Sequence, residues 1–202
     1  MEIQQIEDYI VEFDPITHTY KVDGKPVISV TQLVDEVLPK RYKKVDPEIL
    51  KKAAERGTQL HDMIEQFEVN GVIHPSLEMK SYMRLKRQHS FESIENEKMV
   101  VIAHFGVPIA AGRFDMVVKS PLIRGIGIAD VKRTLHIAED HLKLQLNLYK
   151  LGYEQTYKKP VHYLKCIRVR NAFNEYLDVP VDKEFTRQKI EEYLKKHPID
   201  FT

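Results

Sequence analysis

Two acidic residues and a lysine lie on neighbouring stretches of the chain that have the composition of β-strands. Asp130 and Lys132 are two residues apart in IADVKRT, and Asp115 ends the motif GRFD in the preceding stretch. Residues two apart on a strand point to the same face, and a hairpin would bring Asp115 beside Asp130. Two carboxylates among apolar β residues are costly to bury unless a cation joins them. Oxygen ligands suit Mg²⁺ or Mn²⁺, so the pattern predicts a divalent metal site with Lys132 near a metal-bound water.

A solvated strand face is the ordinary setting of a lone Asp-x-Lys pair, and this alternative stays open. The apolar neighbours Ile128, Ala129 and Val131 favour a buried strand instead. We find no serine–histidine–aspartate or cysteine–histidine arrangement that offers a covalent nucleophile. There is also no G-x-x-x-x-G-K-[ST] loop, so the sequence does not predict a P-loop ATPase.

Two helical pairs, each spaced by four residues, add polar groups that could serve the same site. His61 and Glu65 share one face of a predicted helix, and His61 is a candidate metal ligand or phosphate contact. Gln145 and Tyr149 share a face of a Leu-rich helix, where buried polar groups need hydrogen-bond partners. The alternatives are an ordinary core or surface histidine, and core polar residues bonded to the backbone.

The overall composition is that of a soluble globular protein. The chain has 202 residues, 31 of them Lys or Arg and 30 Asp or Glu, so the formal net charge is +1. The single cysteine, Cys166, excludes a disulfide within the chain, a four-cysteine zinc site and a four-cysteine iron–sulfur cluster. With no signal peptide and no apolar run of about 20 residues, we expect a cytoplasmic protein. The balanced charge does not itself point to a nucleic acid.

The order of hydrophobic patterns predicts an α/β or α+β domain whose central mixed sheet is flanked by helices. Asp23-Gly24 is a hairpin turn within residues 16–31, and Ser29 or Thr31 could cap the short helix that follows. Asp46-Pro47 is typical of a helix start. The predicted helices are 31–38, 47–69, 76–90, 138–153 and 183–196, and the predicted strands beyond the hairpin are 97–105, 107–119, 124–133, 161–169 and 176–179.

Taken in order, the motifs resemble the PD-(D/E)XK nuclease superfamily, in particular its RecB-type exonuclease branch without an iron–sulfur cluster. They are G-T-x-x-H ending at His61, GRFD ending at Asp115, D-x-K over 130–132 and Q-x-x-x-Y over 145–149. The leading hairpin also looks like the entry segment of phage-encoded members. The resemblance implies one nuclease domain over 1–202 with a restriction-endonuclease-like core. Its parts would be an N-terminal hairpin and short helix in 1–45, the core in 46–180 and a C-terminal helix in 181–202.

The same resemblance implies a role for each matching residue. One or two Mg²⁺ or Mn²⁺ ions would bind here, Lys132 would orient or activate the hydrolytic water, and Gln145 would position DNA or brace the site with Tyr149. Glu97 matches an acidic position before the first core strand, for which Glu95 is the alternative. The implied metal ligands are His61, Glu97, Asp115, Asp130 and the carbonyl of Val131. The implied catalytic residues are Asp115, Asp130, Lys132, Gln145 and Tyr149.

Local basic patches are the expected DNA contacts, because the total charge is balanced. Arg113 is similar to the family arginine beside the metal aspartate. The other expected substrate-binding residues are Arg84, Arg87, Lys43 and Lys44. Tyr42 and Tyr82 lie within two of the patches and could stack on bases. The alternative is that each patch is an ordinary solvated face.

We therefore expect an exonuclease that acts on single- or double-stranded DNA ends in phage recombination, replication or repair. Such a protein would work in the host cytoplasm if it is phage-encoded. DNA and a recombination or single-strand-binding protein are the expected partners, and a membrane is not. Two alternatives stay open: a structure-specific endonuclease on the same fold, and a non-catalytic module that binds DNA or protein. A metabolic enzyme ranks last, because the sequence has no cofactor loop.

Overall fold

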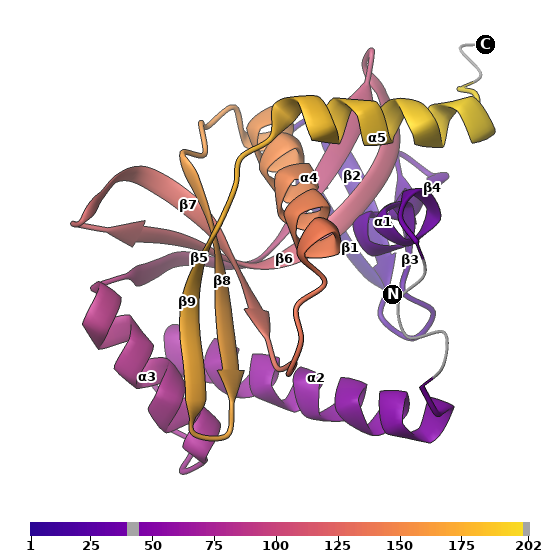
Figure 1. Cartoon of the computed structure of the whole chain (residues 1–202). Helices are drawn as coiled ribbons and strands as arrows, with labels where there is room; N and C mark the ends of the chain where they lie inside the picture. Colours follow the sequence, from indigo (N-terminus) through magenta and orange to yellow (C-terminus); the bar gives the residue numbers. More distant parts are fainter. Residues whose placement is uncertain (40–44, 200–202) are drawn as a thin grey trace.

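The computed structural model describes residues 1–39 and 45–199, and within them nine strands form one mixed sheet with five helices (Figure 1). This confirms the predicted α/β class, a central mixed sheet flanked by helices. The helices are α1 Val30–Val37, α2 Pro47–Asn70, α3 Leu77–His89, α4 Glu139–Tyr157 and α5 Lys183–Lys196. The strands are β1 Glu2–Ile6, β2 Tyr9–Asp14, β3 Thr19–Val22, β4 Lys25–Ser29, β5 Glu92–His104, β6 Val107–Ser120, β7 Ile123–Lys132, β8 Tyr163–Arg170 and β9 Phe173–Val179.

The N-terminal region contains two strands more than the predicted hairpin. The turn at Asp23-Gly24 does join β3 to β4, with positive φ angles of 51° and 76° that fit a type I′ turn. However, β1 and β2 add an antiparallel pair in front of it. Val11 and Phe13 are buried and alternate with more exposed neighbours along β2, which is the period of a half-buried strand. The predicted hairpin and short helix are both present, and the sequence analysis did not predict β1 and β2.

The predicted helix starts are confirmed at α1 and α2. The Ser29 side chain caps α1 by accepting a hydrogen bond from the Gln32 backbone N–H, and the Ser29 backbone N–H donates in turn to the Gln32 side-chain oxygen. Asp46 caps α2 with Pro47 in the first turn. Gly71 ends α2 in the left-handed conformation. These caps fix where the long helix α2 begins and ends against the sheet.

Strand β6 is the branch point of the sheet. It pairs along one edge with β5, whereas its other edge is shared by two strands. On that second edge Ala110 and Ala111 pair with β4, and residues 116–120 pair with β7. Among the described residues no strand pairs with 112–115 on this edge, so the sheet forks at the GRFD motif.

Helices cover both faces of the sheet (Figure 1). Residues of α1, α4 and α5 form one core with apolar side chains of β5, β6, β7 and β8. Residues of α2 and α3 form a second core on the opposite face, and β1–β3 pack a third core against β5 and β6. None of the helices in the described ranges is long and apolar enough to cross a bilayer.

Candidate metal centre

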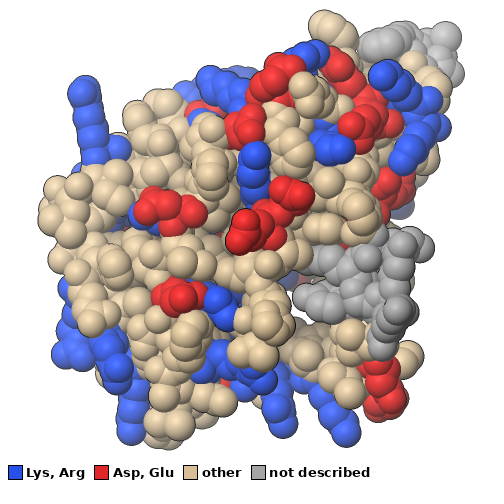
Figure 2. Space-filling model, in the orientation of Figure 1, with Lys and Arg blue, Asp and Glu red and all other residues tan. Residues whose placement is uncertain are grey.

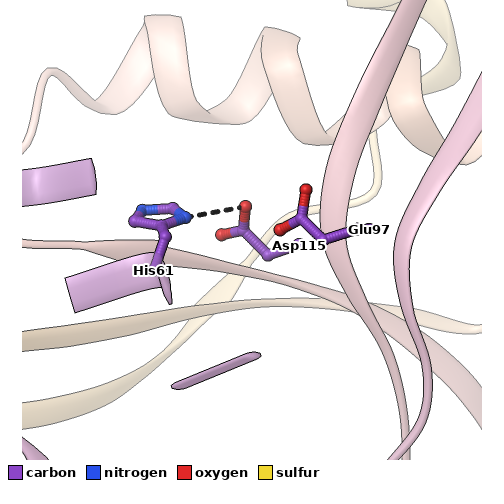
Figure 3. A group of neighbouring side chains, drawn as sticks. All are labelled: His61, Glu97 and Asp115. Atoms are coloured by element: carbon purple, nitrogen blue, oxygen red, sulfur yellow. Dashed lines mark ion pairs between the residues drawn. The ribbon is translucent and has the colours of Figure 1, made fainter. Parts of the chain in front are cut away.

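Three side chains from α2, β5 and β6 meet at the fork of the sheet. One ligand atom each of His61, Glu97 and Asp115 lies within 4.8 Å of the other two. His61 Nδ1 is 3.1 Å from Asp115 Oδ1, and Figure 3 shows the imidazole and both carboxylates turned toward one another. All three side chains are half-buried, and Glu65 and Asn96 line the same small recess. One nitrogen and two carboxylates are a suitable ligand set for a divalent cation.

The backbone around Asp115 and Glu97 explains why these carboxylates face each other. The β5–β6 pairs Asn96–Met116 and Lys98–Phe114 place Glu97 opposite Asp115. Glu97 has a φ of 48°, a left-handed value that is uncommon for a residue other than glycine. A conformation of this kind costs about 1–3 kcal/mol and persists only where its surroundings hold it.

The separation of β6 from β7 leaves a backbone N–H of β7 free to bind the Asp115 side chain. Their last pair is Met116–Ala129, so Val131 of β7 has no partner residue on β6. Its backbone N–H donates instead to Asp115 Oδ2. A buried N–H must find an acceptor, so the fork itself orients this carboxylate.

Asp130 and Lys132, both on β7, lie beside the three-residue group formed by His61, Glu97 and Asp115. Asp130 is 3% exposed, and its Oδ2 atom is 2.7 Å from Lys132 Nζ. Lys132 Nζ also lies 3.3 Å from Gln145 Oε1. The Nε2 atom of Gln145 is in turn 3.4 Å from the hydroxyl of Tyr149, and both residues belong to α4. These sequence-predicted residues therefore form one line of polar contacts from the sheet to α4. Asp130 as a metal ligand, and the Val131 carbonyl beside it, stay predictions.

Gly112, the first residue of GRFD, lets α4 approach the sheet. A Cβ atom at this position would lie 2.9 Å from Tyr149 Cε1 and 2.9 Å from Val30 Cγ2. Tyr149 is buried and contacts Phe114, at 5.7 Å between ring centroids. Glycine at 112 is thus required for the packing that places Tyr149, and through it Gln145, next to Lys132.

The charges of the group are strongly coupled. The carboxylate of Asp115 raises the pKa of His61 to about 9, although burial of the imidazole opposes this. Burial raises the pKa of Asp115, but the nearby His61 and Lys132 and the Val131 N–H outweigh it and hold the pKa below its usual value. Burial and the negative charge of Asp115 raise the pKa of Glu97 to about 7. In the metal-free protein the proton on His61 therefore compensates the carboxylates.

The same coupling keeps Lys132 charged. Burial alone would lower the pKa of Lys132, but Asp130 and Asp115 outweigh it and raise that pKa above its usual value. The side chain is an ammonium group at neutral pH. It can donate hydrogen bonds to a water or a phosphate oxygen, and in this state it is not a base.

Glu97, and not the alternative Glu95, faces Asp115. Glu95 accepts a hydrogen bond of 2.8 Å from the hydroxyl of Tyr153 and lies 3.2 Å from Lys98 Nζ. It belongs to a separate polar group under α4. The sequence could not distinguish the two glutamates, because the left-handed backbone at Glu97 changes the simple alternation of the strand.

Arg113 already has partners within the protein. Its Nε atom is 3.0 Å from Glu97 Oε2, and its Nη1 atom is 3.5 Å from Glu2 Oε2. Its guanidinium carbon lies 5.1 Å from the centroid of the Phe13 ring. A contact of Arg113 with DNA would therefore require that it leave these partners.

Basic residues gather on the side of the molecule formed by α2 and α3. Figure 2 shows Lys and Arg side chains along the lower edge of this view, where Figure 1 has the two helices. Arg84 and Arg87 of α3 are exposed, and their contact with a substrate stays a prediction. The exposed basic residues of the two helices include Lys51, Lys52, Arg56, Lys80, Arg84 and Arg87. Lys43, Lys44 and Tyr42 lie outside the described residues.

The prediction that Tyr82 stacks on nucleic-acid bases was wrong. Tyr82 is fully buried, and its hydroxyl donates a hydrogen bond of 2.7 Å to Glu68 Oε1. Met79, Tyr82 and Leu85 recur at the spacing of one helix face and are all buried. That periodicity was visible in the sequence and indicated a core position.

No protein-family model matches the chain, and no curated protein matches it. Among solved structures, the crystal structure of SSO0001 is similar to this chain with 18% sequence identity and a TM-score of 0.46. The match covers 84% of this chain and 75% of that one. A likeness at this identity and TM-score carries no conclusion about what the protein does.

Proposed function

We propose that the protein is a metal-dependent deoxyribonuclease that hydrolyses phosphodiester bonds from DNA ends. The observation that carries this proposal is the meeting of His61, Glu97 and Asp115 within 4.8 Å, beside the buried Asp130–Lys132 pair. A restriction-endonuclease-like core around this site is part of the proposal. The mixed sheet forked at GRFD, with α4 packed over the fork, supports it.

The residues divide the chemistry between them. His61, Glu97 and Asp115 would hold a Mg²⁺ or Mn²⁺ ion, with Asp130 as the nearest further carboxylate. A bound divalent cation would polarise the scissile phosphate and lower the pKa of a water molecule. Lys132, kept as an ammonium group by Asp130, would donate a hydrogen bond to that water or to a phosphate oxygen. Gln145 would hold the direction of Lys132 from the side of α4.

The basic surface on α2 and α3 supports DNA as the substrate. Arg84 and Arg87 are exposed, and neither is in an ion pair among the described residues. Such side chains can neutralise phosphates along a strand without reading its sequence. The expected binding is therefore weakened by salt and tolerant of sequence.

The test is cleavage of end-labelled linear DNA with Mg²⁺, with Mn²⁺ and with EDTA. We expect cleavage that requires the metal and is lost in Asp130→Ala and Lys132→Ala. Arg187→Ala, on the exposed face of α5, is the matched control and should cleave like the unaltered protein. Absence of metal-dependent cleavage, or unchanged cleavage in both site variants, contradicts the proposal.

A second substrate in the same assay separates the two modes of cleavage. Covalently closed circular DNA has no ends, so an exonuclease leaves it intact. Cutting of the circle would replace the exonuclease by an endonuclease at the same site. Metal-independent DNA binding without any cleavage would favour a non-catalytic binding module.

A further inference from the structure

Arg113 lies between the candidate metal centre and the N-terminal strands. On one side its Nε atom is 3.0 Å from Glu97 Oε2. On the other side it contacts residues of β1 and β2. The ring of Phe13 is 5.1 Å from the guanidinium carbon, and Glu2 Oε2 is 3.5 Å from Nη1. Tyr20 of β3 stacks on Phe13, with ring centroids 4.6 Å apart.

These contacts lie at the fork of the sheet. Residues 112–115 lack a strand partner on one edge among the described residues. Phe13 and Tyr20 pack in one core with Ala111, next to this open part of β6. Both aromatic side chains are buried. The N-terminal strands therefore present a stacked aromatic pair to the Arg113 guanidinium.

Glu97 needs an external restraint of this kind. Its φ of 48° is unfavourable for a residue with a side chain, and local sequence preference does not produce it. The carboxylate it presents is half-buried and faces Asp115. A planar guanidinium in contact with this carboxylate fixes its direction and offsets the repulsion from Asp115.

We propose that Arg113 is a positioning residue of the metal centre, which orients Glu97 and is itself held by Phe13 and Glu2 of the N-terminal strands. The metal-binding part of this inference rests on the proposed function. It gives the N-terminal strands a task in the site, although none of their residues belongs to the three-residue group. It also means that Arg113 supports metal binding through Glu97 and does not contact DNA.

The two assignments of Arg113 predict opposite patterns in two binding measurements on the full chain. One is the dissociation constant for Mn²⁺, measured by calorimetry without DNA. The other is the affinity for a fluorescent linear duplex in EDTA. Arg113→Lys, which keeps the charge but not the planar fork, and Arg113→Ala should both weaken Mn²⁺ binding, by about tenfold or more. Duplex affinity in EDTA should stay within about twofold of the unaltered protein, because no phosphate contact is lost.

Arg84→Ala is the matched control, because Arg84 is an exposed arginine on the basic surface. It should lower duplex affinity and leave Mn²⁺ binding unchanged. Glu2→Gln removes the charge that Arg113 Nη1 contacts at an exposed position, so it tests the N-terminal strands without a large packing change. We expect it to weaken Mn²⁺ binding by less than Arg113→Ala does. Thermal unfolding of each variant shows whether the fold is intact.

Outcomes for the inference and for the proposed function are distinguishable. Loss of Mn²⁺ binding in Asp115→Asn, with unchanged binding in both Arg113 variants, overturns the positioning role and leaves the metal centre intact. Weakened duplex binding with unchanged Mn²⁺ binding in those variants makes Arg113 a substrate contact instead. If the unaltered protein binds no Mn²⁺, both proposals fail.

Discussion

Two polar groups lie along α2, seven residues apart, and they differ in how their charges are satisfied. Glu68 is paired with Lys86, whose Nζ atom is 2.7 Å from Oε1, and accepts a hydrogen bond of 2.7 Å from Tyr82. The Glu68 side chain is only 4% exposed. At His61, by contrast, two carboxylates from neighbouring strands approach one imidazole. The first group is a complete ion pair. In the second group there are two carboxylates, and among the described residues only Glu97 is in direct contact with an arginine, Arg113.

The difference shows what distinguishes a structural ion pair from a site that can bind a cation. The charge that balances Glu68 is the ammonium group of Lys86, a fixed part of the protein. The charge that balances Asp115 is a proton on His61, which a metal ion can replace. The two groups therefore respond differently to mutation, to pH and to metal.

The largest expected effect is that of Asp115→Asn. Without this carboxylate the group loses its central ligand, so we expect Mn²⁺ binding to disappear and the DNA cleavage rate to fall by about a thousandfold. Stability of the metal-free protein should fall at pH 7, because the ion pair between Asp115 and the protonated His61 is lost. Calorimetry, a single-turnover cleavage assay and thermal unfolding measure the three quantities. Cleavage within tenfold of the unaltered rate would remove Asp115 from the site.

The converse variant is Lys86→Met, in the structural pair. It leaves the buried carboxylate of Glu68 without its cation, which costs about 2 kcal/mol. For a chain of 202 residues this is a decrease of about 6 °C in the midpoint of thermal unfolding. Mn²⁺ affinity should stay within about twofold, since Lys86 is outside the metal group. A large loss of metal affinity without a loss of stability would contradict the comparison.

The pH dependence of metal binding tests the exchangeable proton directly. The pKa of His61 is raised to about 9 in the metal-free protein, so at pH 7 a bound metal must displace a proton. Mn²⁺ affinity should therefore rise with pH, by up to about tenfold per unit between pH 7 and pH 9, where Glu97 with a pKa of about 7 is already mostly ionised. At pH 8, calorimetry in buffers of different ionisation enthalpy should detect release of about one proton per ion. Absence of proton release would mean that His61 is not a ligand.

The same shift has an opposite consequence for stability without metal. A histidine whose folded pKa is raised from 6.5 to about 9 stabilises the fold fully below the unfolded value. That contribution is lost as the pH rises through about 9. Metal affinity and metal-free stability should therefore change in opposite directions between pH 7 and pH 9. Urea unfolding in EDTA at several pH values measures the second quantity.

The sequence predicted the core elements because their signals are local. The turn at Asp23-Gly24, the cap at Asp46 and the strands that contain Asp115 and Asp130 each depend on a few neighbouring residues. The family resemblance implied that His61 and Asp115 lie close together, and their side chains are 3.1 Å apart.

Other features depended on residues far apart in the chain. The partner of Arg113 in β1, Glu2, is 111 residues away, and no local pattern predicts that contact. The left-handed backbone of Glu97 also arises from its surroundings, because glutamate does not favour it. The fork at 112–115 requires that β4 and β7 share one edge of β6, which is a property of the whole sheet. These long-range features are the ones that complete the site.

The smallest expected effect comes from a matched pair of tyrosine variants. One is at Tyr149, next to Gln145 on α4, and the other is at Tyr82, next to Glu68. Tyr149→Phe removes a hydroxyl 3.4 Å from Gln145 Nε2, a neutral hydrogen bond worth roughly 0.5–1 kcal/mol. If Gln145 directs Lys132, the cleavage rate should fall by about threefold, with Mn²⁺ affinity unchanged. Tyr82→Phe removes the bond to the Glu68 carboxylate, so it should lower stability by about 1.5 kcal/mol and leave cleavage unchanged. Single-turnover cleavage and urea unfolding of both variants measure these effects. A threefold fall of the cleavage rate in Tyr82→Phe as well would show that the Glu68 group is coupled to the site.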